Sequence, residues 1–200
     1  AGEDKSDLII MGTHGRGLFG RWLIGPVTDK ILHGSAIPVM TVGRVGPPLA
    51  LNRILFATDL SESWKEAARF ALGFTQIVHA SLIGLHVVDI EAQDGAEEAV
   101  YLHDLRFEEA RARMDELQEM AHEERVATDT RVVDGVAGTA ILETAEREST
   151  DLIILAIAKG RLEHENLIGS GAAQVIRRAD IPVLTLPIDV EAARHEAPAA

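Results

Sequence analysis

The tetrapeptide Asp-Leu-Ile-Ile at residues 7–10 recurs, 144 positions later, as Asp-Leu-Ile-Ile at residues 151–154. Two further blocks recur at the same displacement and without a gap: Leu-Ile-Gly at residues 23–25 and 167–169, and Ile-Pro-Val at residues 37–39 and 181–183. One such match in an Ile- and Leu-rich chain is common, but three in a single register are not. The sequence therefore predicts an internal duplication.

The two copies are unequal in length, because residues 51–150 have no counterpart upstream. We expect residues 1–48 to form the closing part of a first domain, ending in the turn-rich linker Gly43–Pro48. Residues 49–190 are predicted to form a complete domain. The polar, Ala- and Pro-rich residues 191–200 are predicted to be a flexible tail.

Short apolar runs alternate with amphipathic stretches throughout the longer copy. Strands are predicted at Arg53–Thr58, Ser81–Val88, Thr128–Asp134, Asp151–Ile157 and Pro182–Leu186. Helices are predicted at Glu62–His79 with Ser61 as N-cap, Ala96–Glu124, Ala137–Arg147 and Gly171–Arg178. The buried stripe of the long helix is predicted at Val100, His103, Phe107, Ala110, Met114, Leu117 and Ala121. This alternation is typical of an α/β fold, a parallel sheet with helices on both faces.

The composition limits the classes of partner. The 32 acidic residues exceed the 19 basic ones and give a net charge of −13, which repels the phosphate backbone of nucleic acids. Cysteine is absent, and no apolar run approaches the ~20 residues of a membrane span. The first residues do not resemble a signal peptide. We therefore expect a cytoplasmic protein that binds neither nucleic acid nor membrane.

A glycine-rich segment follows the apolar run of the shorter copy. It reads Gly-Thr-His-Gly-Arg-Gly at residues 12–17, and Gly25 precedes a predicted helix. Glycines let a ligand approach the backbone closely, and a helix N-terminus favours an anion. The segment is thus either a phosphate cradle or a plain strand-to-helix turn, and the glycines alone do not distinguish the two.

Three stretches together resemble the universal stress protein family. Residues 8–42 resemble the end of such a domain, Arg53–Leu60 its opening strand and Leu85–Asp89 its second strand, and the likeness extends from Asp7 to Pro187. The resemblance implies a five-stranded parallel sheet of order 3-2-1-4-5, preceded here by a partial second copy (strand, loop, helix, strand). It also implies that domains associate through their fifth strands, here Ile37–Val42 and Ile181–Leu186.

Many members of this family bind ATP, so the resemblance implies ATP or a related nucleotide as the ligand. An aspartate and a valine at the positions of Asp59 and Val87 contact the ribose and the adenine in those members, and the glycine loop holds the phosphates. The nucleotide-binding residues implied for this chain are Gly12, Gly15, Gly25, Thr28, Ala57, Thr58, Asp59, Val87, Gly169 and Ser170.

Each copy departs from the family pattern. Pro26 stands where Ser or Thr is expected and removes one N–H group. In the longer copy Ala156 and Lys159 replace the two leading glycines. The Lys159 side chain either blocks the backbone approach or offers its ammonium group to a phosphate. Each copy therefore holds about half a site, and we expect ATP to bind weakly or not at all.

Other residues do not point to catalysis. The eight histidines lack the spacing of metal ligands, so no metal site is expected, and His86 is interpreted as a hydrogen-bonded core residue. Asp59 has no acid–base partner nearby, so its role is either ribose contact or capping of the following helix. We expect a regulatory, nucleotide-binding stress-response protein and not an enzyme. The alternative is an interaction or dimerisation module of the same fold that binds no nucleotide.

Overall fold

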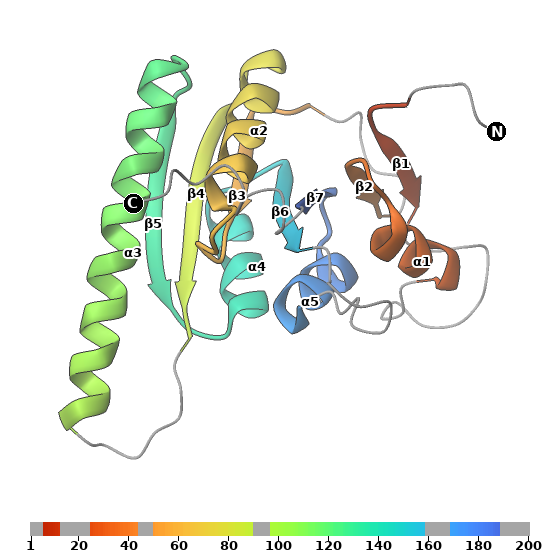
Figure 1. The fold of residues 1–200 in the computed structure, drawn as a ribbon. Coiled ribbons are helices and arrows are strands. Elements are labelled where there is room, and N and C mark those ends of the chain that lie inside the picture. Colours follow the sequence, from red (N-terminus) through yellow and green to blue (C-terminus); the bar gives the residue numbers. More distant parts are fainter. Residues whose placement is uncertain (1–5, 13–24, 44–49, 90–96, 159–168, 189–200) are drawn as a thin grey trace, which may run out of the picture.

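A computed structural model describes residues 6–12, 25–43, 50–89, 97–158 and 169–188 (Figure 1). The elements, in chain order, are β1 (Ile9–Gly12), α1 (Pro26–Gly34), β2 (Val39–Val42), β3 (Arg53–Ala57), α2 (Trp64–Ile77), β4 (Ser81–Val88), α3 (Glu97–Glu123), β5 (Thr128–Asp134), α4 (Ala137–Arg147), β6 (Leu152–Ala158), α5 (Ser170–Arg178) and β7 (Val183–Ile188). Most of the predicted linker and the whole predicted tail lie outside the described residues.

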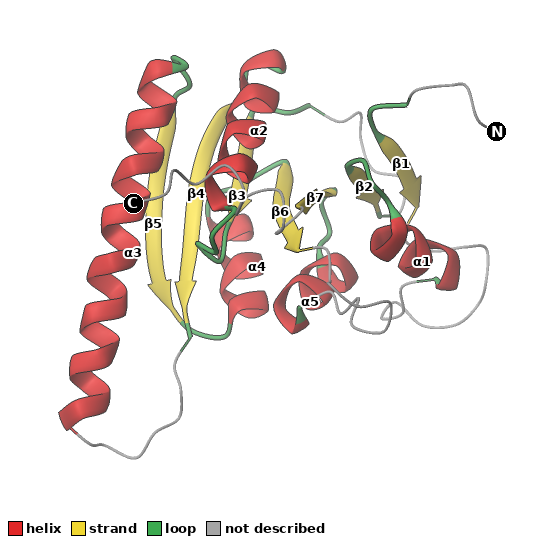
Figure 2. Ribbon diagram, viewed as in Figure 1, coloured by secondary structure: helices red, strands yellow, loops and turns green. Residues whose placement is uncertain are grey.

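All the described strands belong to one sheet of order β1-β2-β7-β6-β3-β4-β5 (Figure 2). The prediction of a five-stranded sheet is therefore wrong, because β1 and β2 extend it to seven strands. Strands β5-β4-β3-β6-β7 follow the expected order and are mutually parallel, with β5 at an edge. The junction between β2 and β7 is antiparallel, whereas β1 and β2 are parallel.

The two segments that match in sequence also have matching strand registers. Ile9 lies opposite Val39 in the β1–β2 pair, and Ile153, 144 residues later, lies opposite Val183 in the β6–β7 pair. Where β2 meets β7, Met40 lies opposite Leu184, which is its own counterpart in the repeat. The two segments are consequently related by a local two-fold axis through that residue pair.

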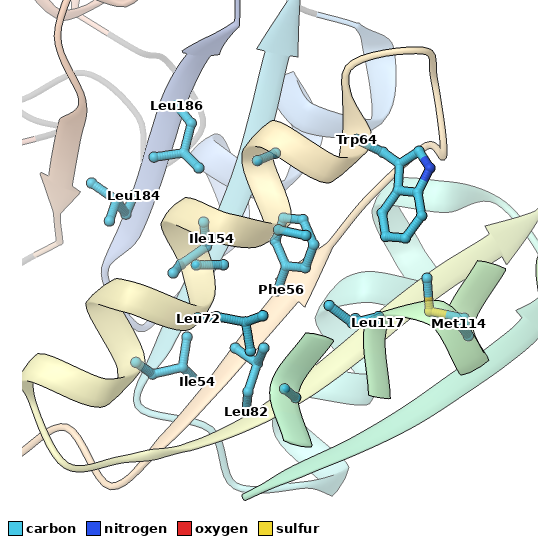
Figure 3. Packing of buried hydrophobic residues seen from close by; sticks show 14 of the residues in the cluster. Ile54, Phe56, Trp64, Leu72, Leu82, Met114, Leu117, Ile154, Leu184 and Leu186 are labelled. Atoms are coloured by element: carbon cyan, nitrogen blue, oxygen red, sulfur yellow. The ribbon is translucent and has the colours of Figure 1, made fainter. Parts of the chain in front are cut away.

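Helices cover both faces of the sheet and enclose two apolar clusters. One cluster lies under α2 and α3, where Phe56, Leu72, Met114 and Leu117 are almost inaccessible to solvent (Figure 3). The other cluster joins residues of α1, α4 and α5 to the opposite face of the sheet. Burial of each such side chain stabilises the fold by about 1.5–3 kcal/mol, so the sheet is fixed from both sides.

Two details of the helices differ from the prediction. The stripe of α3 is fully buried from Ala110 onward, but Val100, near the start of the helix, is 60% exposed. The N-cap of α2 is Ser63 and not Ser61, and its side chain forms no capping hydrogen bond. At the start of α2 and at the start of α3, the helical pattern of the sequence therefore extends beyond the residues that are capped or covered in the structure.

Candidate functional site

A cavity of about 740 Å³ opens at the carboxyl ends of β3, β4 and β6. This is the edge of a parallel α/β sheet at which ligands bind, and the volume suits a small organic ligand. Three further elements complete its wall: the middle of α3 and the N-terminal ends of α4 and α5. Six of the predicted site residues line it, namely Ala57, Thr58, Asp59, Val87, Gly169 and Ser170.

The loop after β3 presents Asp59 to this cavity. The Asp59 carboxylate accepts a hydrogen bond from the backbone N–H of Ser61 at 3.0 Å, and the N–H of Leu60 donates to the Thr58 hydroxyl at 3.1 Å. Asp59 thus closes the turn that leads into α2. A carboxylate accepts several hydrogen bonds, so the turn leaves capacity for a ligand hydroxyl. This geometry is compatible with ribose contact, whereas the capping role is wrong, because α2 is capped at Ser63 and Asp59 closes the turn before it.

The wall around Val87 is apolar. Val87 is half-buried near the end of β4, and Leu85, Ile141 and Leu155 contribute to the same side of the cavity. A planar, weakly polar ring system loses little hydration on packing against such a surface. This part of the cavity can therefore hold a nucleobase.

The N-terminus of α5 supplies the electropositive part of the cavity. The N-cap is Gly169, which has no side chain to accept hydrogen bonds from the N–H groups of the first turn, and that turn contains no acidic residue. A Cβ atom on Gly171 would lie 3.2 Å from the Cβ of Ala137, so glycine allows α5 to approach α4 closely. The N–H groups and the dipole of this helix end favour an anionic group in the cavity.

The predicted site residues of the shorter copy lie elsewhere. Because β2 is antiparallel to β7, β1 and β2 run in the opposite direction to the other strands. The carboxyl end of β1 at Gly12 therefore lies at the end of the sheet where the amino ends of β3, β4 and β6 are, away from the cavity. Gly25 caps α1, as Gly169 caps α5. Thr28 is buried, and its hydroxyl donates to the Gly12 carbonyl at 3.2 Å, so it fastens α1 to β1. Gly15, like Lys159, lies outside the described residues.

Several cavity residues were not predicted from the sequence. Arg106, Glu109 and Arg113 of α3 line the cavity. Ala110 of the same helix is buried, and Glu109, Arg113 and Arg106 stand one, three and four positions from it. A helical projection therefore places all three beside the buried stripe. That spacing was the available signal, but it does not tell which end of the sheet the helix crosses.

Histidine side chains near the cavity are engaged in hydrogen bonds. Nδ1 of His86 donates to the Thr58 carbonyl at 2.9 Å, which confirms the predicted hydrogen bond, but the side chain is half-buried at the cavity and is not a core residue. Nε2 of His103 lies 2.7 Å from a carboxylate oxygen of Asp134 and joins α3 to the end of β5. Within the part of the chain that the structure describes, no three His, Asp or Glu side chains gather as metal ligands.

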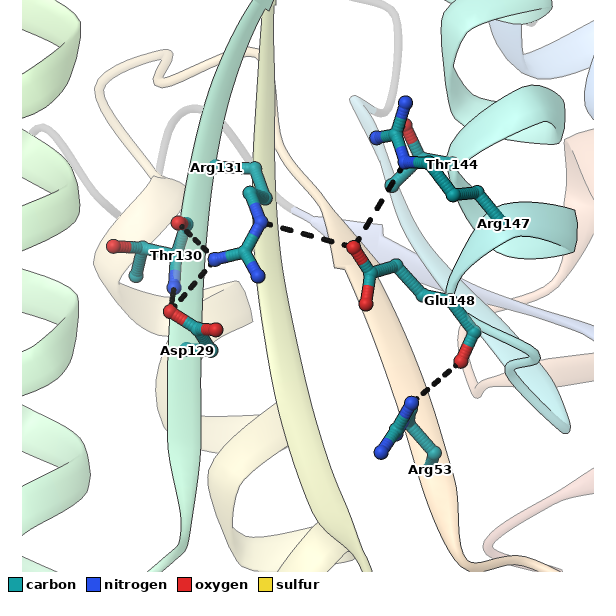
Figure 4. A network of polar contacts seen from close by, with 7 residues as sticks. All are labelled: Arg53, Asp129, Thr130, Arg131, Thr144, Arg147 and Glu148. Atoms are coloured by element: carbon teal, nitrogen blue, oxygen red, sulfur yellow. Dashed lines mark hydrogen bonds and ion pairs between the residues drawn. The ribbon is translucent and has the colours of Figure 1, made fainter.

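A separate polar network lies at the other end of the sheet, near the amino ends of β3 and β5 (Figure 4). Arg131 lies 2.7 Å from Asp129 and 3.8 Å from Glu148, whose backbone carbonyl accepts a hydrogen bond from Arg53. The hydrogen bond from Arg131 is the main cause that lowers the pKa of Asp129. The charges of this network are mutually paired away from the cavity, so we interpret them as structural.

The membrane prediction has one structural counterpart. No helix among the described ranges is both long and apolar enough to cross a bilayer.

Known proteins resemble the chain in sequence over most of its length. Universal stress protein MJ0531 of Methanocaldococcus jannaschii is 30% identical over 140 residues, which cover 68% of this chain and 81% of that protein. Slr1230 of Synechocystis is 24% identical over 181 residues, or 90% of this chain, but only 57% of its own length is covered.

Solved structures show the same fold. The structure of MJ0577, also from M. jannaschii, has a TM-score of 0.61 at 27% identity and is covered over 97% of its chain by 70% of this one. A universal stress protein from Archaeoglobus fulgidus has a TM-score of 0.65 at 24% identity over 92% of this chain, which spans 62% of that longer protein. The model of the universal stress protein family matches residues 1–43 and 50–187. Built on this α/β sheet and matched over nearly its whole length, the chain belongs to the universal stress protein family.

Proposed function

We propose that the chain binds ATP or a related nucleotide in the cavity at the ends of β3, β4 and β6, and acts in the cytoplasm as a nucleotide-dependent regulatory or stress-response protein. One observation carries the proposal. Asp59, Val87 and Gly169 are far apart in the sequence, yet they line a single cavity of about 740 Å³.

The three parts of a nucleotide match three parts of this cavity. The Asp59 carboxylate suits ribose hydroxyls, the apolar wall beside Val87 suits the base, and the N-terminus of α5 suits a phosphate. The cavity offers binding groups of these three kinds, and the Asp59 carboxylate that lines it is already part of a turn. We therefore propose a binding role without catalysis.

The affinity is expected to be low. Ala156 is half-buried and lines the cavity at a position where the family pattern has glycine. Its methyl group holds a ligand further from the backbone of β6 than glycine would. Lys159, the second departure from the pattern, is outside the described residues, and its effect is a question for mutagenesis.

The alternative function, an interaction module, is less well supported. It was expected to use the strands at residues 37–42 and 181–186 for self-association. In this structure β2 and β7 pair with each other inside one chain. Their edges are consequently occupied, and a second chain would have to displace one of them.

The repeat supports a second proposal, on domain organisation. Residues 7–42 are inferred to be the closing part of another domain copy. The N–H of Ile9 donates to the Pro38 carbonyl at 3.0 Å, and the N–H of Ile153 donates to the Pro182 carbonyl at 3.1 Å, with 144 residues between each equivalent pair. Shared register and equivalent connecting bonds are what duplication of a β-α-β unit produces.

Isothermal titration with ATP tests the nucleotide proposal. We expect measurable binding with a dissociation constant above the micromolar range, and a further loss of affinity in Asp59→Ala. Asp115→Ala, which removes the same charge from an exposed site on α3, is the matched control and should bind as the parent does. Lys159→Gly reports whether the lysine blocks or assists binding. Absence of heat with every nucleotide tried would refute the proposal, and sub-micromolar affinity would refute the expectation of weak binding.

A further inference from the structure

Arg113 connects α3 to the loop that carries Asp59. Its Nη1 group donates a hydrogen bond of 2.5 Å to the backbone carbonyl of Leu60, 53 residues away in the sequence. The same side chain lines the cavity. This contact between α3 and the loop after β3 restricts how that loop can move.

The loop needs such a restraint because its backbone is strained. Leu60 has a φ angle of 56°, in the left-handed region that is unfavourable for a residue other than glycine. Its side chain is buried among core residues, and its N–H is bonded to the Thr58 hydroxyl. These local contacts fix the side chain and the N–H of Leu60. The carbonyl is fixed by Arg113.

The orientation of Asp59 depends on the same backbone. Asp59 immediately precedes Leu60, and its carboxylate bonds to the N–H of Ser61, the residue after Leu60. A rotation of the peptide at Leu60 would move this N–H and release the carboxylate from its turn. The bond from Arg113 to the Leu60 carbonyl opposes that rotation, since this carbonyl and the Ser61 N–H belong to one planar peptide unit.

We propose that Arg113 is a positioning residue of the nucleotide site: it holds the Leu60–Ser61 peptide and thereby aims the Asp59 carboxylate into the cavity. The inference rests on the proposed function for the identity of the ligand, but its structural part concerns the loop alone. Guanidinium is suited to this task, because it stays charged and keeps further N–H donors besides the one bonded to Leu60.

Arg111 provides the matched control. It lies on the same helix two residues away and forms an i,i+3 ion pair with Glu108 and a cation–π contact with Phe107. Arg111→Met removes the same charge as Arg113→Met without touching the loop. Arg113→Lys keeps the charge and a donor, and serves as the conservative variant.

The experiment has two independent readouts. The first is amide hydrogen exchange of residues 58–63 without nucleotide. We expect faster exchange in Arg113→Met, near-parental exchange in Arg111→Met and an intermediate rate in Arg113→Lys. Unchanged exchange in Arg113→Met would overturn the inference whether or not the protein binds ATP.

The second readout is ATP titration in a double-mutant cycle. Arg113→Met should weaken binding by about tenfold, the loss expected for one charge-assisted hydrogen bond, with partial rescue by lysine. In the Asp59→Ala background it should have no further effect, because the group that it positions is gone. An equal loss in both backgrounds would show that Arg113 acts independently of Asp59 and would overturn the inference. If the parent itself binds no nucleotide, the proposed function fails, and the exchange experiment alone decides the role of Arg113.

Discussion

Ile10 and Ile154 occupy equivalent positions of the repeat, but 63% of Ile10 is exposed to solvent and none of Ile154 is. Ile10 lies opposite Met40 in the β1–β2 pair, as Ile154 lies opposite Leu184 in the β6–β7 pair. The difference comes from what covers them. Ile154 also pairs with Phe56 of β3 and lies in the cluster under α2, whereas no described strand lies on the outer side of β1.

The stability of the chain should respond very differently to truncation of these two isoleucines. Ile154→Ala leaves a cavity in a closed core and should lower the free energy of unfolding by about 2–5 kcal/mol. Ile10→Ala removes an exposed side chain and should change it by less than about 0.5 kcal/mol. Urea denaturation of both variants checks this. Similar losses at the two sites would mean that Ile10 is covered in solution.

The open edge of β1 should make the chain self-associate. An edge strand presents unpaired backbone groups, and the exposed Ile10 adds apolar surface to them. Size-exclusion chromatography with light scattering should detect species larger than the monomer, and Ile10→Lys should shift the distribution towards the monomer. A strictly monomeric protein whose amides at residues 8–11 are strongly protected from exchange would contradict this prediction.

Gly84→Ala should destabilise the domain. A Cβ atom at this position of β4 would collide with the buried side chain of Leu117 and lie 3.4 Å from Cγ2 of Thr130. Overpacking of this kind costs about 1–3 kcal/mol. Gly73→Ala is the control, because a Cβ atom there meets nothing within 4 Å and a helical alanine is favoured by about 0.5–1 kcal/mol. Thermal denaturation should therefore move the two melting temperatures in opposite directions.

Acid should weaken the polar network at the amino end of β5. The hydrogen bond from Arg131 lowers the pKa of Asp129 below its ordinary value of 3.8. Because this pKa is lower in the folded state, the ionised Asp129 carboxylate stabilises the fold above pH 3.8. This contribution is lost as the pH falls through the pKa of the folded state. The free energy of unfolding of Asp129→Asn should therefore be less dependent on pH below about 4 than that of the parent. Because the Asp129 side chain is 59% exposed, the effect should be small and should decrease with added salt.

The elements of the longer copy were predictable because they follow local periodicity. The bounds of β4, β5 and α4 agree with the prediction residue for residue. The pairing of β2 with β7 follows no local periodicity, because it joins residues more than 140 positions apart. The association of these two strands was expected from the family resemblance, and the structure shows it within one chain, but the seven-stranded sheet that results was not expected. The sequence repeat shows that two segments are alike, and it does not show that they share one sheet.

The site was predictable in part. The family resemblance implied Asp59, Val87 and Gly169, which lie after β3, near the end of β4 and before α5, and parallel strands bring their carboxyl ends together. Gly12 ends β1, but the antiparallel junction places it at the opposite end of the strands from the cavity. The contribution of Arg113 depends on where a long helix crosses the sheet, which is set by tertiary packing and has no local signature.

The antiparallel junction between β2 and β7 also determines the order in which the sheet can be completed during synthesis. Thr41 donates its hydroxyl to the Val183 carbonyl, and Thr185 donates to the Val39 carbonyl, across 142 and 146 residues of chain. At about 5–20 residues per second, β2 is synthesised roughly 7–30 seconds before its partner strand. The β2 strand is thus made well before the strand that it pairs with, and for that interval its edge facing β7 is unpaired and open to a chaperone or a neighbouring nascent chain.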